Sequence, residues 1–326
     1  KRQVHGIRAE TARRDRTVSD RTARDQTLRD GIMKVRIGVA AGPGVATDPD
    51  ALFELVDTLE DLGYDSLWVP DIVTTPTLDP IAALAAAAGR RSKLKLGTHL
   101  IVPGRNPVLL ARQLASLDRL SNGRLLLMAV IGLRRPEELA AQGVEAGERT
   151  AMLEESLTVM RALWRGEEVT FAGRHVALEG VSLGIRPIQD PLEVWLGGMV
   201  PAALRRCGRL GEGWMPGLCT PAEAAAARAT IEREAEKAGR HIDAEHFGVN
   251  LSFTDRLDDR VREAIAARRP ELAAEELVAI GPEGLGTRID DFLAVGFSKF
   301  VIRPTIEPAS WPEAVTGVAE VLERQS

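Results

Sequence analysis

From Lys34 onward, short apolar runs alternate with longer amphipathic stretches. The runs are continuously apolar, which is typical of parallel strands buried on both faces. Several amphipathic stretches begin with proline after Asp or Thr, as helix N-termini do. The predicted strands are Val35–Ala41, Ser66–Val69, Leu94–Ile101, Leu125–Ile131, Leu192–Leu196, Gly213–Met215, Phe247–Phe253 and Phe300–Arg303. The predicted helices are Pro49–Leu62, Pro80–Arg90, Pro107–Leu120, Arg149–Trp164, Pro201–Leu210, Pro221–Ala238, Pro282–Val295 and Pro312–Arg324.

Eight strands interleaved with helices predict an α/β fold, a (β/α)8 TIM barrel. A doubly wound open sheet is the structural alternative. One connection is too long for a simple loop: Val169–Leu178 alternates around Ala172-Gly173 and predicts a β-hairpin inserted between strands four and five. The charged stretch Thr254–Gly281 predicts helix and no strand.

Residues 1–32 differ from the rest of the chain. They hold nine Lys or Arg against five acids, a charge of +4 that leaves −9 for the remainder of a chain whose net charge is −5. Few large apolar residues are present to offset the entropy of ordering. We expect a basic, disordered and dispensable extension, followed by one domain over residues 33–326. A basic arm for anionic partners is the alternative.

Composition narrows the functional class. A net charge of −5 gives no support for nucleic-acid binding. Cys207 and Cys219 lie in no metal-binding or disulfide pattern, which favours a reducing compartment and no metal. No apolar run reaches the roughly 18 residues of a membrane helix, and no signal peptide opens the chain. We expect a cytoplasmic protein with a small-molecule substrate and no membrane partner.

Barrel enzymes place their sites at the C-terminal ends of the strands, so the residues there are the candidates. Strand two runs into Trp68-Val-Pro-Asp71-Ile72, and strand three continues through Gly97–Pro103. Strand four ends Met128–Gly132, and strand five ends Trp195-Leu-Gly197-Gly198. Bare glycines between a strand and a helix let backbone N–H groups approach a phosphate, although a tight turn alone also explains them.

Several blocks, in their order and spacing, resemble the bacterial luciferase-like superfamily, and above all its branch that uses coenzyme F420, an 8-hydroxy-5-deazaflavin. The similarity covers about residues 34–304, and no single block carries it alone. The blocks are Gly63–Trp68, Asn106-Pro107, Leu117–Arg124, Leu163-Trp164, Trp195–Gly198, Gly211–Trp214 and Gly296–Pro304.

The resemblance implies a barrel with an insertion, a flavin or deazaflavin ring in its mouth, and hydride transfer or oxygen activation there. A flat ring needs apolar walls and a few placed donors, while the cofactor performs the difficult chemistry. We expect that the protein can form a homodimer.

The resemblance assigns catalytic roles to His99 and Asp71. An imidazole titrates near neutrality and can transfer a proton, whereas a lone strand histidine is otherwise a core residue. Asp71 would bond near the deazaflavin hydroxyl, or else cap a helix. Arg303 would pair with a phosphate or acidic tail, or hold a structural carboxylate. The full cofactor-binding set is Asp71, His99, Leu100, Val102, Ala129, Gly132, Gly197, Gly198, Met199, Trp214 and Arg303.

Two local features complete the expected site. The family often has a non-prolyl cis peptide in a bulge of strand three, which corresponds here to His99–Leu100 and costs about 3–4 kcal/mol. Arg149 and Glu154 or Glu155 predict a structural ion pair at the start of a helix.

The sequence also departs from the family. Ile72 stands where relatives often have His after Asp, and Met128–Gly132 is bulkier than their small-residue strand end. Leu133-Arg134-Arg135 replaces an acidic residue of some deazaflavin dehydrogenases, so the sugar-phosphate subfamily is a poor guide to the substrate. We predict an F420-dependent oxidoreductase of a small organic substrate. The alternatives are a reduced-FMN-dependent monooxygenase and a non-catalytic binder.

Overall fold

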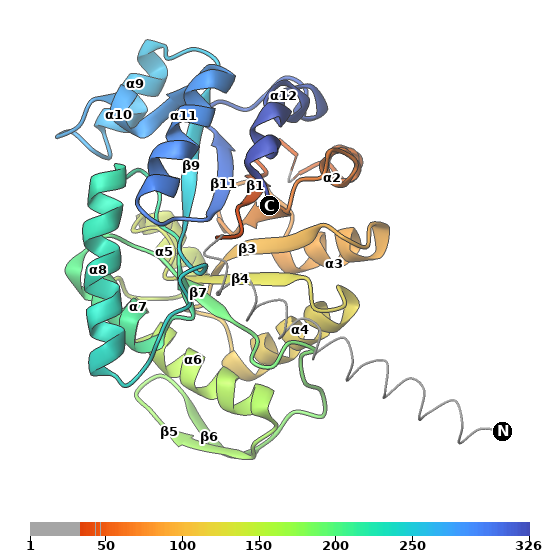
Figure 1. Ribbon diagram of the computed structural model, residues 1–326. Helices are drawn as coiled ribbons and strands as arrows, with labels where there is room; N and C mark the ends of the chain where they lie inside the picture. Colours follow the sequence, from red (N-terminus) through yellow and green to blue (C-terminus); the bar gives the residue numbers. More distant parts are fainter. Residues whose placement is uncertain (1–32, 43, 46) are drawn as a thin grey trace.

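A computed structural model describes residues 33–326 except 43 and 46, so the predicted 1–32 extension lies outside the described residues. Nine parallel strands form one curled sheet with helices around its outside (Figure 1). Their order is β10-β9-β11-β1-β2-β3-β4-β7-β8. The strands are β1 Arg36–Ala40, β2 Ser66–Pro70, β3 Lys95–Ile101, β4 Leu125–Val130, β7 Val194–Leu196, β8 Gly213–Trp214, β9 Gly248–Thr254, β10 Val278–Ile280 and β11 Lys299–Pro304.

Two isolated parallel bridges link β8 to the segment of β9. They join Trp214 to Phe247 and Gly217 to Asn250, and the Asn250 amide donates to the Pro216 carbonyl at 2.8 Å. The series from β9 through β11, β1, β2, β3, β4 and β7 to β8 therefore returns to its start. β10 lies outside this series, on the far edge of β9. The architecture is TIM-barrel-like.

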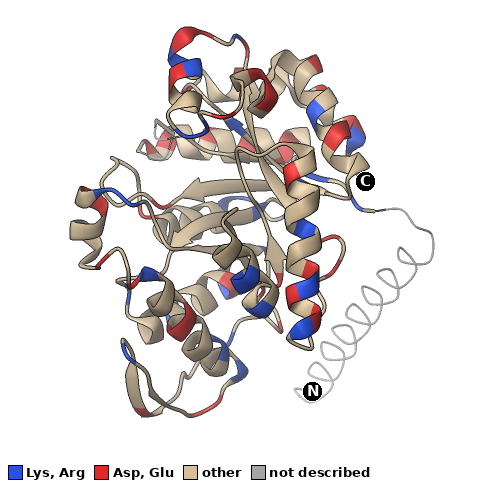
Figure 2. Ribbon diagram, turned by 90° about the vertical axis from the view of Figure 1, so that its left-hand side faces the viewer, with Lys and Arg blue, Asp and Glu red and all other residues tan. Residues whose placement is uncertain are grey.

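Helices follow most strands, and four of them begin with proline behind a side-chain cap. Asp48, Asp79, Asn106 and Thr220 each accept a backbone hydrogen bond from the first turn. Charged residues gather on these helices and their loops, while the strands are mostly uncharged (Figure 2). The helices are α2 Pro49–Leu62, α3 Pro80–Arg90, α4 Pro107–Leu120, α5 Pro136–Gln142, α6 Arg149–Arg165, α7 Pro201–Leu210, α8 Pro221–Lys237, α9 Asp259–Ala266, α10 Ala274–Leu277, α11 Gly281–Ala294 and α12 Trp311–Gly317.

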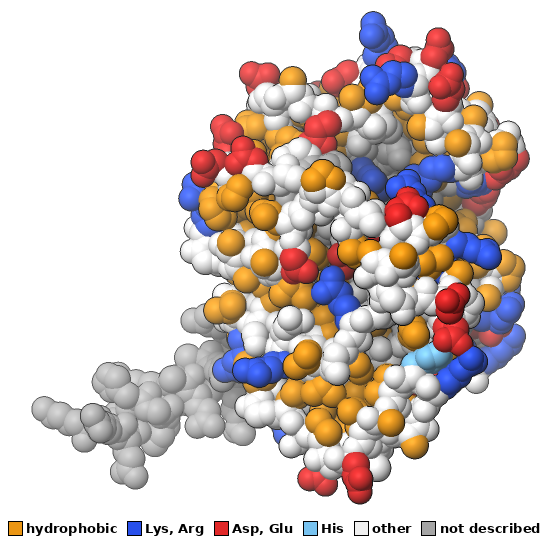
Figure 3. Space-filling view, turned by 180° about the vertical axis from the view of Figure 1, so that it is seen from behind, with side chains coloured by type: hydrophobic (Ala, Val, Ile, Leu, Met, Phe, Trp, Pro, Cys, Tyr) orange, Lys and Arg blue, Asp and Glu red, His pale blue; other side chains and the backbone are white. Residues whose placement is uncertain are grey.

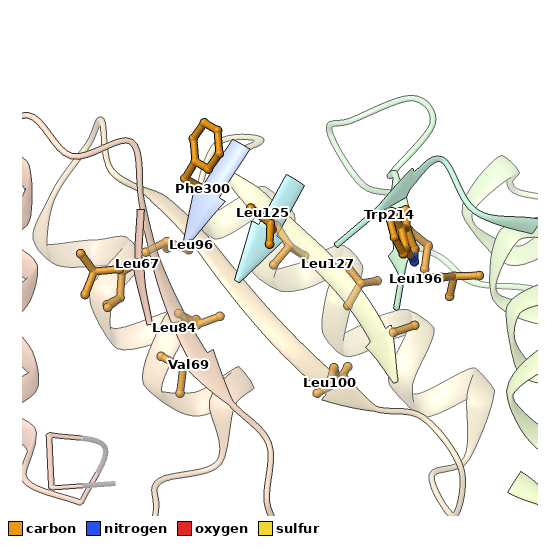
Figure 4. Close-up of a cluster of buried hydrophobic side chains, with 14 of the residues drawn as sticks. Leu67, Val69, Leu84, Leu96, Leu100, Leu125, Leu127, Leu196, Trp214 and Phe300 are labelled. Carbon is orange, nitrogen blue, oxygen red and sulfur yellow. The ribbon is translucent and has the colours of Figure 1, made fainter. Parts of the chain in front are cut away.

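Alternation along each strand divides the buried side chains into two sets. Outward-facing residues pack against the helices, as Leu67 and Val69 do beside Leu84 of α3 (Figure 4). The other set forms a separate apolar cluster made only by strands and strand ends. We call the face that carries this second set the inner face. Its buried members are Ala40, Trp68, Met128, Trp195, Met215 and Val301.

The structure differs from the predicted elements at the C-terminal end. The stretch Thr254–Gly281 contains β10, which the sequence did not predict because a run of three apolar residues is too short to show a period. The predicted helix Pro312–Arg324 is two elements, α12 and a 3-10 helix over Ala319–Arg324. The break follows Gly317, a poor helix former. Helix α5, in the loop after β4, was also not predicted.

The connection between β4 and β7 carries a separate two-stranded antiparallel sheet of β5 Val169–Ala172 and β6 Ala177–Val181. Its turn is held from outside by Glu155 of α6. The Glu155 carboxylate accepts backbone N–H bonds from Arg174, His175 and Val176 at 2.9–3.0 Å. These bonds lower the pKa of Glu155.

The block Leu117–Arg124 fixes the last part of the same connection, shortly before β7. Asp118 is fully buried, and its carboxylate accepts bonds from the Ile188 amide at 2.6 Å and from the backbone and side chain of Gln189 at 2.9 and 2.6 Å. Arg124 donates to the carbonyls of Ser121, Leu94 and Ala88, at 2.7, 2.6 and 2.9 Å respectively. The block therefore joins α4, β3 and the long connection.

We predict that Asp118→Asn lowers the free energy of unfolding by about 2–3 kcal/mol, because an amide presents donors to donors and leaves buried groups unpaired. Urea denaturation measures the change. Asp61→Asn is the matched control, since the Asp61 side chain is 65% exposed and pairs only at the surface. Equal losses in the two variants would contradict the structural role of Asp118.

Candidate functional site

His99 lies on the inner face near the C-terminal end of β3. It stands in register between Pro70 of β2 and Met128 of β4. Its ring centroid lies 5.1 Å from that of Trp68. Its Nε2 is buried and has no hydrogen-bond partner among the described residues. A buried polar atom without a partner is uncommon and points to a bound group or water.

The surroundings of His99 set its charge. The pKa of His99 is lowered from 6.5 to about 4, mainly by burial and in part by the positive charge of Arg303, while a hydrogen bond with Asn250 acts in the opposite direction. The imidazole is therefore neutral at neutral pH. Sequence reasoning missed Asn250, whose only signal is a polar residue on the inner face of β9, beside Val301.

Strand β3 is regular where a bulge was expected. Residues Leu96–Ile101 pair one to one with Leu125–Val130 without a register shift. The only cis peptide bond within the described part of the chain is Asp190–Pro191. The prediction of a cis bond at His99–Leu100 is therefore wrong. An uninterrupted ladder on both sides of β3 holds the trans geometry, and the chain leaves the sheet after Ile101 instead.

Asp71 ties the ends of β2 and β3 together. Its Oδ2 accepts a bond from the Ile101 amide at 2.9 Å and one from Arg105 at 2.9 Å. Arg105 also donates to the Ile101 carbonyl at 2.9 Å. Burial raises the pKa of Asp71, while Arg105 and the Ile101 amide lower it. The carboxylate holds the site's edge in place rather than standing free beside His99.

Four residues of the expected cofactor set face the helices. Leu100, Val102, Ala129 and Trp214 belong to the outer core, with exposed fractions of 0–2%. Leu100 and Trp214 lie among the buried side chains of Figure 4. Only their backbone borders the inner face. Trp214 nevertheless acts on the site, because its Nε1 donates to the Gly198 carbonyl at 3.1 Å.

Gly197 and Gly198 form the turn from β7 into α7. Gly198 has φ +98°, which favours glycine, and a side chain at Gly197 would lie 2.4 Å from Met128 Cε. The N-cap of α7, Val200, makes no side-chain capping bond. The first turn of α7 therefore keeps N–H groups without a capping side chain, next to Met199.

Two buried charged residues fix the loops beside the site. Arg149 donates to the carbonyls of Ile131, Gly132 and Leu133 at 3.2, 2.9 and 3.2 Å. Glu138, which is fully buried, accepts from the amides of Val73 and Thr74. The predicted ion pair of Arg149 with Glu154 or Glu155 is wrong, because the Arg149 guanidinium points to these backbone carbonyls instead. Glu154 bonds Arg209, and Glu155 holds the β5–β6 turn.

Arg303 is exposed and follows Val301 by two residues on β11, so it lies on the inner face. It makes no ion pair or hydrogen bond with another described residue. Partial desolvation of the guanidinium is the main cause that lowers the pKa of Arg303, and the charge of Arg268 also lowers it. Figure 3 shows Lys and Arg side chains gathered beside a hollow on one face of the molecule.

A cavity at the amino ends of the strands lies at the opposite end from these residues. Lys299 stands over the Trp195 ring at 4.7 Å, and burial lowers its pKa to about 8. Apolar side chains make up most of the wall. The lining residues are Arg36, Asp65, Ser66, Trp68, Leu126, Trp195, Met215, Lys299, Phe300 and Val301.

The described helices include none that is long and apolar enough to cross a membrane.

Comparison with known proteins places this geometry in a family. A relative named F420-dependent glucose-6-phosphate dehydrogenase, from Nakamurella multipartita, is 30% identical over 210 residues, which are 60% of this chain and 60% of the relative. A second of the same name, from Amycolatopsis mediterranei, is 31% identical over 53% of this chain and 54% of the relative. The matched part thus spans less than two thirds of these curated relatives.

Solved structures share the fold at lower identity. An F420-dependent secondary alcohol dehydrogenase in complex with an F420–acetone adduct superposes with a TM-score of 0.75 at 20% identity, over 89% of this chain and 99% of that one. A long-chain alkane monooxygenase gives 0.74 at 16% identity, over 90% and 92%. The family model described as luciferase-like monooxygenase matches residues 32–287. This chain belongs to the luciferase-like monooxygenase family.

Proposed function

We propose that this chain is an F420-dependent oxidoreductase that moves a hydride between the deazaflavin and a small organic substrate. The observation that carries the proposal is His99, which lies on the inner face near the strand ends and whose buried Nε2 has no hydrogen-bond partner in the part of the chain that the structure describes. The bound deazaflavin would supply the hydride chemistry. The protein's own residues would bind and orient the cofactor and the substrate, and would exclude water. We propose that the fold carrying these residues is a closed (β/α)8 barrel, with β5 and β6 as its insertion.

The role of His99 follows from its charge. A neutral imidazole can donate one hydrogen bond and accept another. Its lowered pKa makes His99 a weak base, so the imidazole is suited to positioning a polar atom through a hydrogen bond. It would accept a proton only from a strongly acidic reacting group. Trp68 beside it supplies a flat apolar wall. Asp71 acts as a positioning residue through Ile101.

The phosphate-bearing tail of the cofactor fits the start of α7. Bare backbone at Gly197 and Gly198, with an uncapped first helical turn, is the arrangement that favours an anion. Trp214 fixes the Gly198 carbonyl and thereby the turn. Met199 and Gly132 border the same end of the sheet.

Support for F420 over FMN comes from the curated relatives, two of which carry F420 in their names. Reduced-FMN-dependent oxygenation is the second candidate, since a monooxygenase is among the solved structures that share the fold. The start of α7 would accept the phosphate of either cofactor. A non-catalytic binder is the third reading, because Ile72 stands where relatives have His.

The cofactor is tested by titrating the full chain with F420 and with FMN and following fluorescence. We expect F420 to bind and FMN to bind at least about tenfold more weakly, a difference of about 1.4 kcal/mol. Tighter FMN binding would favour the monooxygenase. Failure of both to bind would overturn the proposed function.

The phosphate site is tested with Ala202→Glu in the exposed first turn of α7. A glutamate there stabilises the helix but repels a phosphate, so F420 affinity should fall about tenfold while the melting temperature stays or rises. Ala202→Gln is the size-matched control. An 8-hydroxy-5-deazaflavin without its phosphate tail should bind both variants equally, and a loss with that probe would indicate a steric effect instead.

His99 gives a pH-dependent signal. Its folded pKa of about 4 lies below its usual 6.5, so the unfolded chain binds the proton first. Stability should fall as pH drops from about 6.5 to 4, by about 2 kcal/mol at pH 4.5 relative to pH 7. His99→Asn should lack this component in urea titrations and should weaken F420 binding. A variant with the wild-type pH dependence would contradict the buried neutral imidazole.

A further inference from the structure

We propose that Lys299 is a reactive amine that captures a small aldehyde as an imine, in the cavity at the amino ends of the strands. Lys299 is the first residue of β11, whereas His99 lies near the carboxyl end of β3. The site is therefore separate from the proposed cofactor site and does not depend on the proposed function. The ligand that it would take is a short, apolar carbonyl compound.

Two glycines give the Lys299 side chain room on the inner face. Strands β9 and β8 lie between β11 and β7, and each has a glycine at this level. Gly248 is the register partner of Lys299, and Gly213 is that of Trp195. A Cβ atom at Gly248 would lie 3.0 Å from the Lys299 Cβ, and one at Gly213 would lie 2.3 Å from Cε2 of Trp195. Without side chains there, the Lys299 Nζ reaches a place 4.7 Å from the centre of the Trp195 ring.

The wall around this amine is mostly apolar. Trp195 and Met215 belong to the inner apolar cluster and line the cavity together with Lys299. Trp68 Nε1 donates to Ser66 Oγ at 3.1 Å, so the polar atoms of these two lining residues are bonded to each other. Lys299 keeps part of its surface exposed, which lets a solute reach it. A lining of this kind favours a small molecule with an apolar body.

On the side of β1 and β3, the nearest acid is paired with other cations. Asp65 Oδ1 accepts a bond from Lys95 Nζ at 2.8 Å and lies 3.4 Å from Nε of Arg36. Arg36 is the register partner of Lys299. The amine of Lys299 thus faces two cations whose shared carboxylate is already engaged.

On the side of β7 and β9, the acids are also held by other groups. Glu193 Oε2 lies 3.6 Å from Nε2 of His246, and Glu245 accepts a bond from the Lys34 amide at 3.2 Å. Among the residues that the structure describes, Lys299 has no hydrogen-bond partner and no carboxylate within ion-pair distance of its Nζ. An amine in this setting gains little from being charged.

Desolvation and a neighbouring cation are the two conditions that make a lysine nucleophilic. Burial lowers the pKa of Lys299 to about 8, and the charge of Lys95 also lowers it, while three acids act in the opposite direction. At pH 8 about half of the Lys299 amine is neutral, against about 0.3% of an ordinary lysine with a pKa of 10.5.

The capture step is a condensation. The lone pair of the neutral nitrogen adds to the carbonyl carbon, the nitrogen loses both of its protons, and the carbonyl oxygen leaves as water. A C=N bond replaces the C=O bond, and nothing is oxidised or reduced. The hydrocarbon part of the aldehyde would then pack against Trp195 and Met215, which line the same cavity.

The test exposes the full chain to limiting propanal for a short time and then traps imines with sodium borohydride. Mass spectrometry of the peptides gives the labelled fraction of each lysine. Lys93 is the internal control, since it is exposed and carries no ion pair. At about pH 8 we expect Lys299 to be labelled at least about tenfold faster than Lys93. Labelling of Lys299 should level off above pH 8, whereas that of Lys93 should rise up to about pH 10.

Two variants and a denatured sample complete the test. Lys299→Met should lose the fast label and leave Lys93 unchanged. Lys237→Met, at a lysine whose side chain is 69% exposed on α8, should keep it. In denaturing urea, Lys299 and Lys93 should react at equal rates, because the preference depends on the cavity.

Three outcomes would overturn the reactive amine. They are equal labelling of Lys299 and Lys93 in the folded chain, a Lys299 rate that keeps rising to pH 10, and a preference that survives in urea. The wild-type comparison is made within one folded sample, so it decides the matter even if Lys299→Met does not fold. Failure of F420 to bind would not affect any of these results.

Discussion

The structure depends on one constraint: the curled sheet buries side chains on both of its faces, so alternate residues of a strand serve different purposes. Outward residues such as Leu100 belong to the packing against helices, with no exposed area. Inward residues such as His99 and Arg303 are the ones that can meet a ligand. A register slip of one residue in β3 would exchange His99 for Leu100 and remove the site. Packing against α3 and α4 therefore fixes the register of β3 and keeps His99 on the inner face.

A second rule governs the loops at the strand ends: buried charged groups bind backbone rather than each other. Asp71 holds the Ile101 amide, Arg149 holds carbonyls after β4, and Glu138 holds the loop after β2. Such charge-assisted bonds are strong in a poorly hydrated environment and fix loops that carry few apolar contacts. These charged side chains are engaged in holding the loops at the strand ends. Asp71 resembles a catalytic residue in the sequence because it is an acid at the end of a strand, but its carboxylate bonds the Ile101 amide.

Most strands and helices could be predicted from the sequence. The spacing of their apolar residues and the prolines at the helix N-termini are signals that lie within each element itself. β10 could not, since its three residues become a strand only by pairing with β9. The approximate place of His99 followed from a family motif, but its neighbours did not. Asn250 is far from it in sequence and carries no motif. The prediction of a cis bond was wrong because the hydrogen-bond ladder between β3 and β4 is continuous. That continuity depends on both strands and not only on the residues around His99.

Arg303 of β11 and His99 of β3 both lie on the inner face. The charge of Arg303 lowers the pKa of His99, and Arg303 has no counter-ion among the residues that the structure describes. Burial of His99 is the larger effect, so the imidazole stays neutral in the free protein.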